Sequence, residues 1–394
     1  MTHNEQEKVG ICLSGGGFRA ALFHLGALRR LNELGILSQA DIITSVSGGS
    51  VFAAHLATKI PEGWPKSGIS DWEFLVSVPF REFTSRDLSN GAILKRLWPW
   101  NWFRPDTSVR ELARRYRERL TGLRLVKLPK RPDFVFCATD MAFAVNWVFQ
   151  RERMGSYKVG YAEPPPTRYL VADAVAASSA LPPFFNPLRI DGATGFTHGD
   201  APKGERAMAL QDLRLTDGGF YDKLGLEPVW KECDYVLASD GGSSFKVAPY
   251  RGPIRRLYRY LAVMERQAGA LRRSRLISKF KRKPPTLKGA YWSVNNWCTQ
   301  YPDWKKVHKA DPDARPSYRK KLVRNRIANI RTDMNAFTEA ESCVLENHGY
   351  LLAAAAIESY AKELDVLGGE LILSVPHPDW MDEKRVREAL ANSA

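Results

Sequence analysis

The sequence predicts an α/β fold in which helices cover both faces of a mostly parallel sheet. Residues 9–14 form a short apolar run bounded by glycines, and leucines at helical spacing follow it from Leu22 to Leu34. A second strand and helix follow: residues 41–46 are typical of a buried strand, and small residues from Ser50 begin a helix. The order strand–helix–strand–helix indicates a parallel sheet covered on both faces.

Further elements follow the same reasoning. Apolar runs that are typical of strands occur at residues 133–138, 235–239 and 371–375. In the segment 251–288, apolar residues recur at spacings of three and four, which predicts an amphipathic helix. We expect one domain over residues 1–394, with a core at about 8–245 and a helical, basic elaboration at about 246–394.

The positive charge of the chain is unevenly distributed. The net charge is +15, and residues 251–288 contain thirteen Lys and Arg but one acid, Glu265. Residues 315–331 contain seven Lys and Arg and no acid. Such segments favour anionic partners, and since no nucleic-acid-binding module accompanies them we expect a lipid surface rather than nucleic acid. The alternative for 251–288 is a helix packed on the body with a solvated basic face.

Residues 97–104 contain three Trp and one Phe. Tryptophan at this density is typical of a bilayer interface, and equally of a loop or lid that covers a core. The segment therefore adds a second candidate for contact with a membrane.

Composition points away from metals and cofactors. The five cysteines are scattered without a Cys-x-x-Cys pair, and the seven histidines have no ligand spacing, so we expect neither metal nor cofactor. Scattered thiols favour a reducing compartment. We find no signal peptide and no apolar run of roughly 20 residues. We therefore expect a cytoplasmic protein that meets membranes as a peripheral protein.

The glycine-rich turn Ser14-Gly15-Gly16-Gly17 follows the first predicted strand. Its unshielded backbone N–H groups suit negative charge at a helix N-terminus. Phosphate binding is the alternative, but the turn lacks the Lys-Ser/Thr of a P-loop and the spacing of a dinucleotide fingerprint. Arg19 opposes the helix dipole there, so we expect it to brace the loop through carbonyl groups or to meet a phosphate.

Ser47 lies on a second strand-to-helix turn, Ser45-Val46-Ser47-Gly48-Gly49, which suits a nucleophile that projects from the backbone. The alternative is that Ser47 or Ser50 only caps the helix. The backbone N–H groups of Gly16, Gly17 and Gly48 are candidates for an oxyanion site. The two turns together supply what acyl transfer needs.

The base that would activate Ser47 is less evident. His348 and His377 are the two histidines nearest the C-terminus, and neither has the surroundings of an active-site loop. Asp217 and Asp240 each precede two glycines after a strand-like stretch, which holds a carboxylate on a tight turn. The sequence pattern does not choose between these two aspartates.

Taken in order, the blocks Gly-Gly-Gly-x-Arg, x-x-Ser-x-Gly and Asp-Gly-Gly, with residues 177–185 ahead of the aspartate, resemble the patatin-like phospholipase family. The resemblance implies a three-layer α/β/α fold and a Ser–Asp dyad without histidine that hydrolyses acyl esters of lipids. On this chain it implies Ser47 as nucleophile and Asp217 as base. The oxyanion loop would consist of Gly15, Gly16, Gly17 and Arg19.

The sequence departs from the family pattern at three positions near the dyad. Ser45 and Ala20 replace glycines, and Lys223 stands where asparagine is common. Ser47 and Asp217, the two groups that would react, are both present. We therefore expect a phospholipase A-type lipid acyl hydrolase. The alternatives are an inactive patatin-like scaffold that binds membranes and a soluble esterase or thioesterase.

Overall fold

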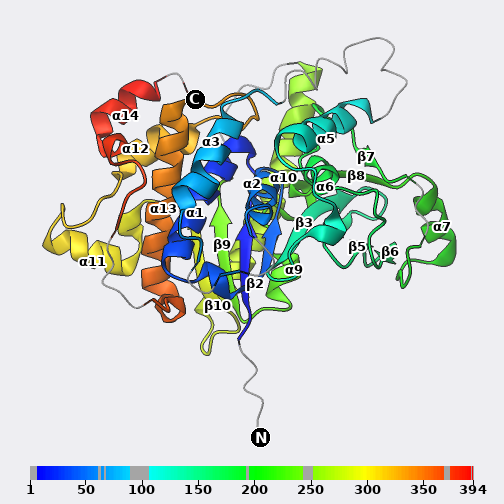
Figure 1. Ribbon diagram of the computed structural model, residues 1–394, viewed down its shortest axis with the longest axis horizontal. Helices are drawn as coiled ribbons and strands as arrows, with labels where there is room; N and C mark the ends of the chain where they lie inside the picture. The colour runs from blue at the N-terminus through cyan, green and yellow to red at the C-terminus, as the bar shows by residue number, and fades with distance from the viewer. Residues whose placement is uncertain are drawn as a thin grey trace, which may run out of the picture.

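The computed structural model describes residues 7–60, 64–65, 68–88, 106–191, 195–242, 252–367, 373–391 and 393. The Trp-rich segment 97–104 lies outside these residues. Within them the chain forms one ten-stranded sheet between two layers of helices (Figure 1). This is the three-layer α/β/α arrangement that the sequence predicts.

The parallel part of the sheet has the order β10–β9–β1–β2–β3. Its strands are β1 (Val9–Leu13), β2 (Ala40–Ser45), β3 (Asp133–Asp140), β9 (Tyr235–Asp240) and β10 (Lys288–Ser293). The antiparallel part contains β4 (Val145–Phe149), β5 (Met154–Ser156), β6 (Gly160–Ala162), β7 (Leu188–Arg189) and β8 (Arg214–Asp217). Strand β8 pairs with the end of β3, which sets Asp217 opposite Ala138.

Two hydrophobic cores lie on the two faces of the sheet because side chains alternate along each strand. In β1, Ile11 and Leu13 belong to the larger core, whereas Cys12 belongs to the smaller one. The larger core contains residues of α1 (Gly17–Glu33), α2 (Gly48–Ala57), α3 (Val78–Thr84), α5 (Thr107–Arg119), α6 (Val171–Ser178) and α13 (Glu339–Tyr360). The smaller core contains residues of α9 (Glu227–Trp230) and α10 (Pro253–Lys281).

The remaining helices are short. They are α7 (Lys203–Gln211), α8 (Gly219–Asp222), α11 (Pro302–Ala310), α12 (Lys320–Asn325) and α14 (Glu383–Ala389). Single turns occur at Leu37–Gln39, Glu73–Ser77, Leu125–Lys127, Cys298–Gln300, Ile327–Asn329, Lys362–Leu364 and Pro378–Met381. No helix of the described residues is long and apolar enough to cross a membrane.

Four of the predicted strands are confirmed as β1, β2, β3 and β9. The strand predicted at 371–375 is wrong for residues 373–375, which form no strand, and residues 371–372 lie outside the described part. Leu373 and Val375 instead pack against the larger core from a loop. The place beside β9 is taken by β10, which pairs with β9 in parallel.

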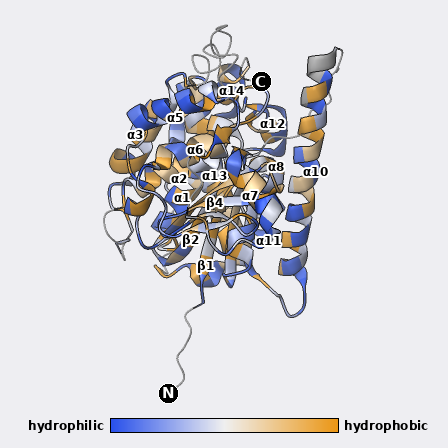
Figure 2. Cartoon of the chain, turned by 90° about the vertical axis from the view of Figure 1, so that its right-hand side faces the viewer, coloured by the Kyte–Doolittle hydropathy of each residue, from blue (hydrophilic) through white to orange (hydrophobic). Residues whose placement is uncertain are grey.

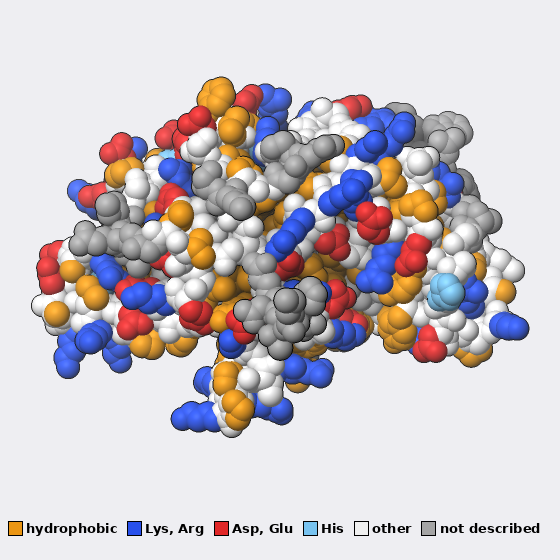
Figure 3. All heavy atoms as spheres, turned by 60° about the horizontal axis from the view of Figure 1, so that its bottom comes forward, with side chains coloured by type: hydrophobic (Ala, Val, Ile, Leu, Met, Phe, Trp, Pro, Cys, Tyr) orange, Lys and Arg blue, Asp and Glu red, His pale blue; other side chains and the backbone are white. Residues whose placement is uncertain are grey.

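The two basic segments, 251–288 and 315–331, differ in structure. Residues 253–281 form the long helix α10, which stands along one side of the molecule (Figure 2). In the second segment, Arg315 pairs with Glu358 at 2.5 Å and Arg331 with Glu341 at 3.2 Å, so part of its charge holds the chain to α13. On the lower face, cations lie interspersed with carboxylates rather than in one patch (Figure 3).

Candidate active site

Ser47 occupies the turn between β2 and α2 with φ of +50°. Such a backbone conformation is strained for a residue other than glycine and is typical of a nucleophile turn. The Ser47 side chain makes no capping hydrogen bond to its helix, so the capping interpretation is wrong for this residue. Its hydroxyl instead lies near the carboxylate of Asp217, where it lowers the pKa of that group.

A network of buried serines holds this turn. The Ser47 backbone N–H donates to the hydroxyl oxygen of Ser178 at 2.9 Å, and the Ser178 hydroxyl donates to the carbonyl of Cys137 at 2.6 Å. Ser50 lies 2.9 Å from the Ser178 hydroxyl and donates to Ser45 at 3.1 Å. Ser45, the departure from the family pattern, is therefore a partner in this network. Ser178 at the end of α6 was not found from the sequence.

Asp217 ends β8 and is 5% exposed. Its carboxylate accepts a hydrogen bond from the Gly219 backbone N–H at 2.7 Å. Burial, followed by repulsion from Glu265, raises the pKa of Asp217 to about 7, although the hydrogen bond from Gly219 and the nearby Ser47 hydroxyl oppose the shift. A carboxylate with this pKa is suited to accept a proton near neutral pH.

The other aspartate is engaged elsewhere. The Asp240 carboxylate accepts hydrogen bonds from the Gly242 N–H at 2.9 Å and from the Tyr291 hydroxyl at 2.7 Å. The two histidines nearest the C-terminus also have other partners: His348 Nε2 lies 3.0 Å from the Val294 carbonyl, and His377 Nε2 lies 2.8 Å from Glu346. The structure thus brings Asp217, and neither Asp240 nor these histidines, to Ser47.

The glycine turn touches the serine turn through main-chain atoms. A Cβ on Gly48 would lie 2.1 Å from the Gly17 carbonyl oxygen, a contact that only glycine permits. The backbone N–H groups of Gly16, Gly17 and Gly48 have no acceptor among the described residues. They remain candidates to bind an oxyanion. Gly15 differs, because its N–H donates to the Lys223 carbonyl at 3.0 Å, so its expected donor role is corrected to a structural one.

Arg19 is buried and binds carbonyl groups from two other parts of the chain. Its guanidinium donates to the Gly241 carbonyl at 3.1 and 3.2 Å and to the carbonyls of Ala328 and Ile330 at 3.1 and 2.9 Å. Burial lowers the pKa of Arg19 to about 10. Arg19 thus binds carbonyl groups, as the sequence suggested, but they belong to residues outside the glycine turn. Gly241 packs against Gly16 of that turn, so Arg19 is connected to the turn only through Gly241.

His24 supports the same turn and was not found from the sequence. Its Nε2 lies 3.0 Å from the Ser14 carbonyl and its Nδ1 lies 2.8 Å from the Ser239 hydroxyl. Burial lowers the pKa of His24 to about 4, so the ring is neutral near pH 7. A neutral ring fits a structural role beside the turn.

Helix α10 contributes a charged residue next to Asp217. Glu265 accepts a hydrogen bond from the Lys223 ammonium group at 2.7 Å and forms an ion pair with it, and a Cβ on Gly219 would lie 3.4 Å from the Glu265 carboxylate. Lys223 is the departure from the family's asparagine, and here it pairs with a residue of the basic elaboration. No local sequence pattern connects these two residues, which are 42 positions apart.

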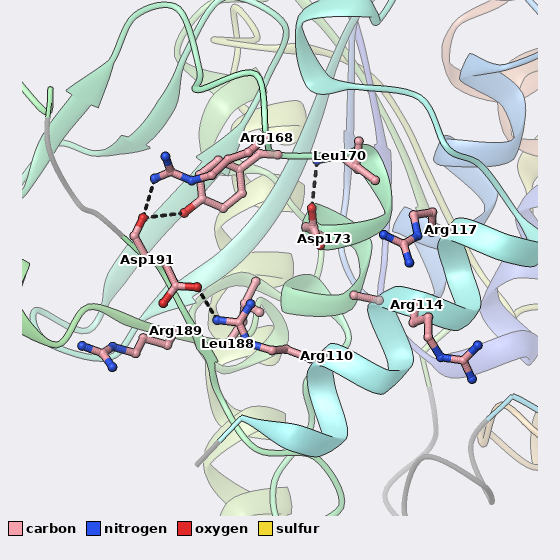
Figure 4. A pocket seen from close by; sticks show the side chains of 11 residues that line it. Arg110, Arg114, Arg117, Arg168, Leu170, Asp173, Leu188, Arg189 and Asp191 are labelled. Carbon is pink, nitrogen blue, oxygen red and sulfur yellow. Dashed lines mark hydrogen bonds and ion pairs between the residues drawn. The ribbon is translucent and has the colours of Figure 1, made fainter. Parts of the chain in front are cut away.

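A separate pocket of about 330 Å³ lies beside α5 and the start of α6 (Figure 4). Arginines line it, but their charges are largely balanced: Arg110 bonds Asp191, Arg114 pairs with Glu111 and Glu118, and Arg189 lies 3.5 Å from Asp212. Asp173, at the opposite end of α6 from Ser178, also faces it. The pocket is therefore distinct from the Ser47 turn.

The described residues contain no group of three His, Cys, Asp or Glu side chains that could hold a metal ion. A model of the family described as patatin-like phospholipase matches residues 11–230. The chain belongs to the patatin-like phospholipase family. The match covers the glycine turn, the Ser47 turn and Asp217, and it ends at the last residue of α9.

This patatin-like chain is similar in sequence to the Saccharomyces cerevisiae protein named "Putative meiotic phospholipase SPO1". It is 29% identical over 89 residues, which are 22% of this chain and 14% of the yeast protein. Human GIVD cytosolic phospholipase A2 matches 62% of this chain and 47% of its own, at 16% identity and a TM-score of 0.44. VipD from Legionella pneumophila matches 90% of this chain and 67% of its own, at 13% identity and a TM-score of 0.35. The chain thus spans a small part of the yeast relative and less than half of the human structure.

Proposed function

We propose that this protein is a serine lipid acyl hydrolase of the phospholipase A type, with Ser47 as nucleophile and Asp217 as base. The observation that carries the proposal is the position of the Ser47 hydroxyl near the Asp217 carboxylate, on a strained turn beside glycine N–H groups without an acceptor among the described residues. Membership of the patatin-like phospholipase family supports a lipid ester as substrate.

In the proposed reaction, the Ser47 hydroxyl oxygen attacks the ester carbonyl carbon while Asp217 accepts its proton. The negative charge that develops on the carbonyl oxygen is held by the N–H groups of Gly16, Gly17 and Gly48. The ester C–O bond then breaks, and the leaving alcohol takes the proton from Asp217. Water attacks the acyl-serine, Asp217 accepts a proton from that water, and Ser47 regains a proton as the fatty acid departs.

The raised pKa of Asp217 supports its part in these steps. A carboxylate with the ordinary pKa of about 3.9 is a weak base toward a serine hydroxyl. With its pKa at about 7, Asp217 is a stronger base that is still about half ionised at neutral pH. We further propose that the substrate is a lipid in a membrane, which the protein meets as a peripheral protein from the cytoplasm.

The proposal is tested by incubating the purified protein with mixed phospholipid vesicles and following released fatty acids by mass spectrometry. Wild type should release fatty acids, and Ser47→Ala and Asp217→Asn should each abolish release. Asp240→Asn is the matched control and should stay active. Activity in Asp217→Asn together with its loss in Asp240→Asn would overturn the choice of base.

Two further measurements separate the alternatives. A fluorophosphonate probe should label wild type at Ser47 and leave Ser47→Ala unlabelled, whereas an inactive scaffold would not be labelled at all. A soluble esterase or thioesterase would hydrolyse short soluble esters and leave vesicle lipids intact.

A further inference from the structure

Helix α10 has two faces with different chemistry. A Cβ on Gly269 would lie 3.8 Å from the Lys223 side chain, Arg272 donates to the Tyr221 carbonyl at 3.0 Å, and Leu276 is fully buried in the smaller core. Glu265 is on the same side, because residues three, four and seven apart share a face of a helix. This face holds α10 to the body and next to Asp217.

The opposite face carries apolar side chains that the protein leaves in solvent. Their spacings of three, four and seven place them along one stripe. The stripe consists of Leu257, Tyr260, Met264 and Leu271, which are 54%, 61%, 64% and 69% exposed. We call these four residues the α10 stripe. It follows about 21 Å of the helix at 1.5 Å per residue.

The charge of α10 lies beside this stripe. The helix sequence contains nine Lys and Arg and one acid, and that acid, Glu265, faces the body in its ion pair with Lys223. The outer surface of the helix therefore combines exposed apolar side chains with cations such as Arg256, Arg259 and Arg266 and contains no carboxylate. Apolar side chains flanked by Lys and Arg are the pattern of helices that lie in the interface of an anionic bilayer.

Three of the four stripe residues also lie toward the end of the molecule where the reaction would take place. Strand β9 ends at Asp240 on the same edge of the sheet as the Ser47 turn, because β1, β2 and β9 are parallel. Helix α10 follows β9 and runs back toward β10, so residues that precede Glu265 lie toward that edge. Leu257, Tyr260 and Met264 all precede Glu265.

We propose that the α10 stripe is the surface by which this protein docks on anionic lipid bilayers, with its active-site edge turned toward the lipid. The proposal rests on the proposed function, since it names the surface on which that site would find its substrate. A protein partner is less consistent with the stripe, because four side chains expose a few hundred Å², whereas stable protein interfaces bury about 800 Å² per partner.

A fluorescent probe at Leu257 tests the contact directly. All five native cysteines are buried, so a thiol-reactive, environment-sensitive dye should label Leu257→Cys selectively. Met208→Cys on α7 is the matched control, because Met208 is a 69% exposed apolar residue on a different helix. With vesicles of equal parts phosphatidylcholine and phosphatidylglycerol, the dye at 257 should shift to the blue and the dye at 208 should not. A silent dye at 257 on protein that sediments with these vesicles would overturn the proposal.

Charge substitutions test whether the stripe contributes to binding. Met264→Glu and Leu271→Glu should each weaken sedimentation with these vesicles by about tenfold or more, since each loses an apolar contact and adds repulsion. Met208→Glu should bind like wild type. Equal binding by all three variants, or equal wild-type binding to pure phosphatidylcholine vesicles, would overturn the proposal.

Hydrolysis of a short-chain soluble ester separates this proposal from the proposed function. The stripe variants should keep wild-type turnover of such an ester, which also shows that they are folded. Loss of vesicle binding with intact ester turnover supports the docking surface. Unchanged vesicle binding with intact turnover overturns the docking surface alone, whereas wild type that shows no Ser47-dependent turnover overturns the proposed function.

Discussion

Lys223 Nζ lies 2.7 Å from the Glu265 carboxylate, and this ion pair joins the residue after α8 to α10 beside Asp217. Glu265 is, after burial, the second cause of the raised pKa of Asp217. Lys223 acts in the opposite direction on the same carboxylate. The basicity of Asp217 therefore depends on how α10 is docked against the catalytic core.

We expect Glu265→Gln to shift the pH profile of ester hydrolysis. Removing the negative charge lowers the pKa of Asp217 below its wild-type value of about 7, because repulsion no longer opposes ionisation. Since Asp217 acts as a base only when ionised, the rising limb of kcat/KM should move to lower pH. Glu205→Gln on α7 is the control and should leave the limb in place. A rising limb at the wild-type pH in Glu265→Gln would contradict this account.

Asp217 should also make stability depend on pH. Its pKa is raised from 3.8 to about 7 in the folded protein, so the folded state holds this proton more tightly than the unfolded chain does. This contribution to stability is full below about pH 4 and is lost as the pH rises through about 7. Asp217→Asn avoids the cost of ionisation and should therefore melt at a higher temperature than wild type above pH 7.

The advantage of Asp217→Asn should amount to a few kcal/mol at most, since one pKa unit corresponds to about 1.4 kcal/mol. It should shrink as the pH falls toward about 4, where both states of wild type are protonated. Thermal melts at several pH values measure it. An advantage that is the same at every pH would show that Asp217 does not titrate as described.

Much of the candidate site was predictable because buried parallel strands appear in the sequence as apolar runs that are followed by glycine-containing turns. The strands β1 and β2 and the two turns that follow them are examples. Strand β8, Arg214–Asp217, has no apolar run, and its position comes from pairing with β3. The choice of Asp217 over Asp240 therefore needed the family resemblance.

Residues that support the site could not be found locally. Ser178 lies 131 positions from Ser47 in the sequence, and Glu265 belongs to α10, which lies beyond the matched residues 11–230. Their contacts with the site arise from tertiary packing between distant segments. The spacing of residues within one short segment carries no information about such contacts. The predicted strand is wrong at residues 373–375 for the same reason, since an apolar run does not reveal whether it covers a core or joins a sheet.

We expect Ser178→Ala to impair turnover more than stability. It removes the acceptor of the Ser47 N–H and the donor to the Cys137 carbonyl, which should cost about 1–3 kcal/mol of unfolding free energy. The loosened nucleophile turn should lower kcat by ~10–100-fold. Ser156→Ala is matched, because this buried serine also donates one hydrogen bond, to Asp140 at 3.1 Å, and accepts one, from the Val159 N–H at 3.2 Å, and neither involves the Ser47 turn. Equal kcat values for the two variants would argue against a positioning role for Ser178.

We expect Gly48→Ala to be destabilised and inactive. The added Cβ would lie 2.1 Å from the Gly17 carbonyl oxygen, and two backbone turns cannot move apart as a flexible side chain would. Overpacking of this kind costs roughly 1–3 kcal/mol or more. Gly122→Ala is the control, because no atom lies within 4 Å of its added Cβ, and its melting temperature should stay close to that of wild type. A wild-type melting temperature in Gly48→Ala would disprove the contact.

The contact between Gly48 and Gly17 has a consequence for how this protein can diversify. The spacing between the proposed nucleophile and the proposed oxyanion donors is set by contact of main chain with main chain, so side-chain substitutions elsewhere leave it unchanged. Adaptation to a different lipid would have to arise in the walls around the two turns and in α10. A redesign of substrate preference can accordingly keep residues 15–19 and 45–50 constant and vary their surroundings.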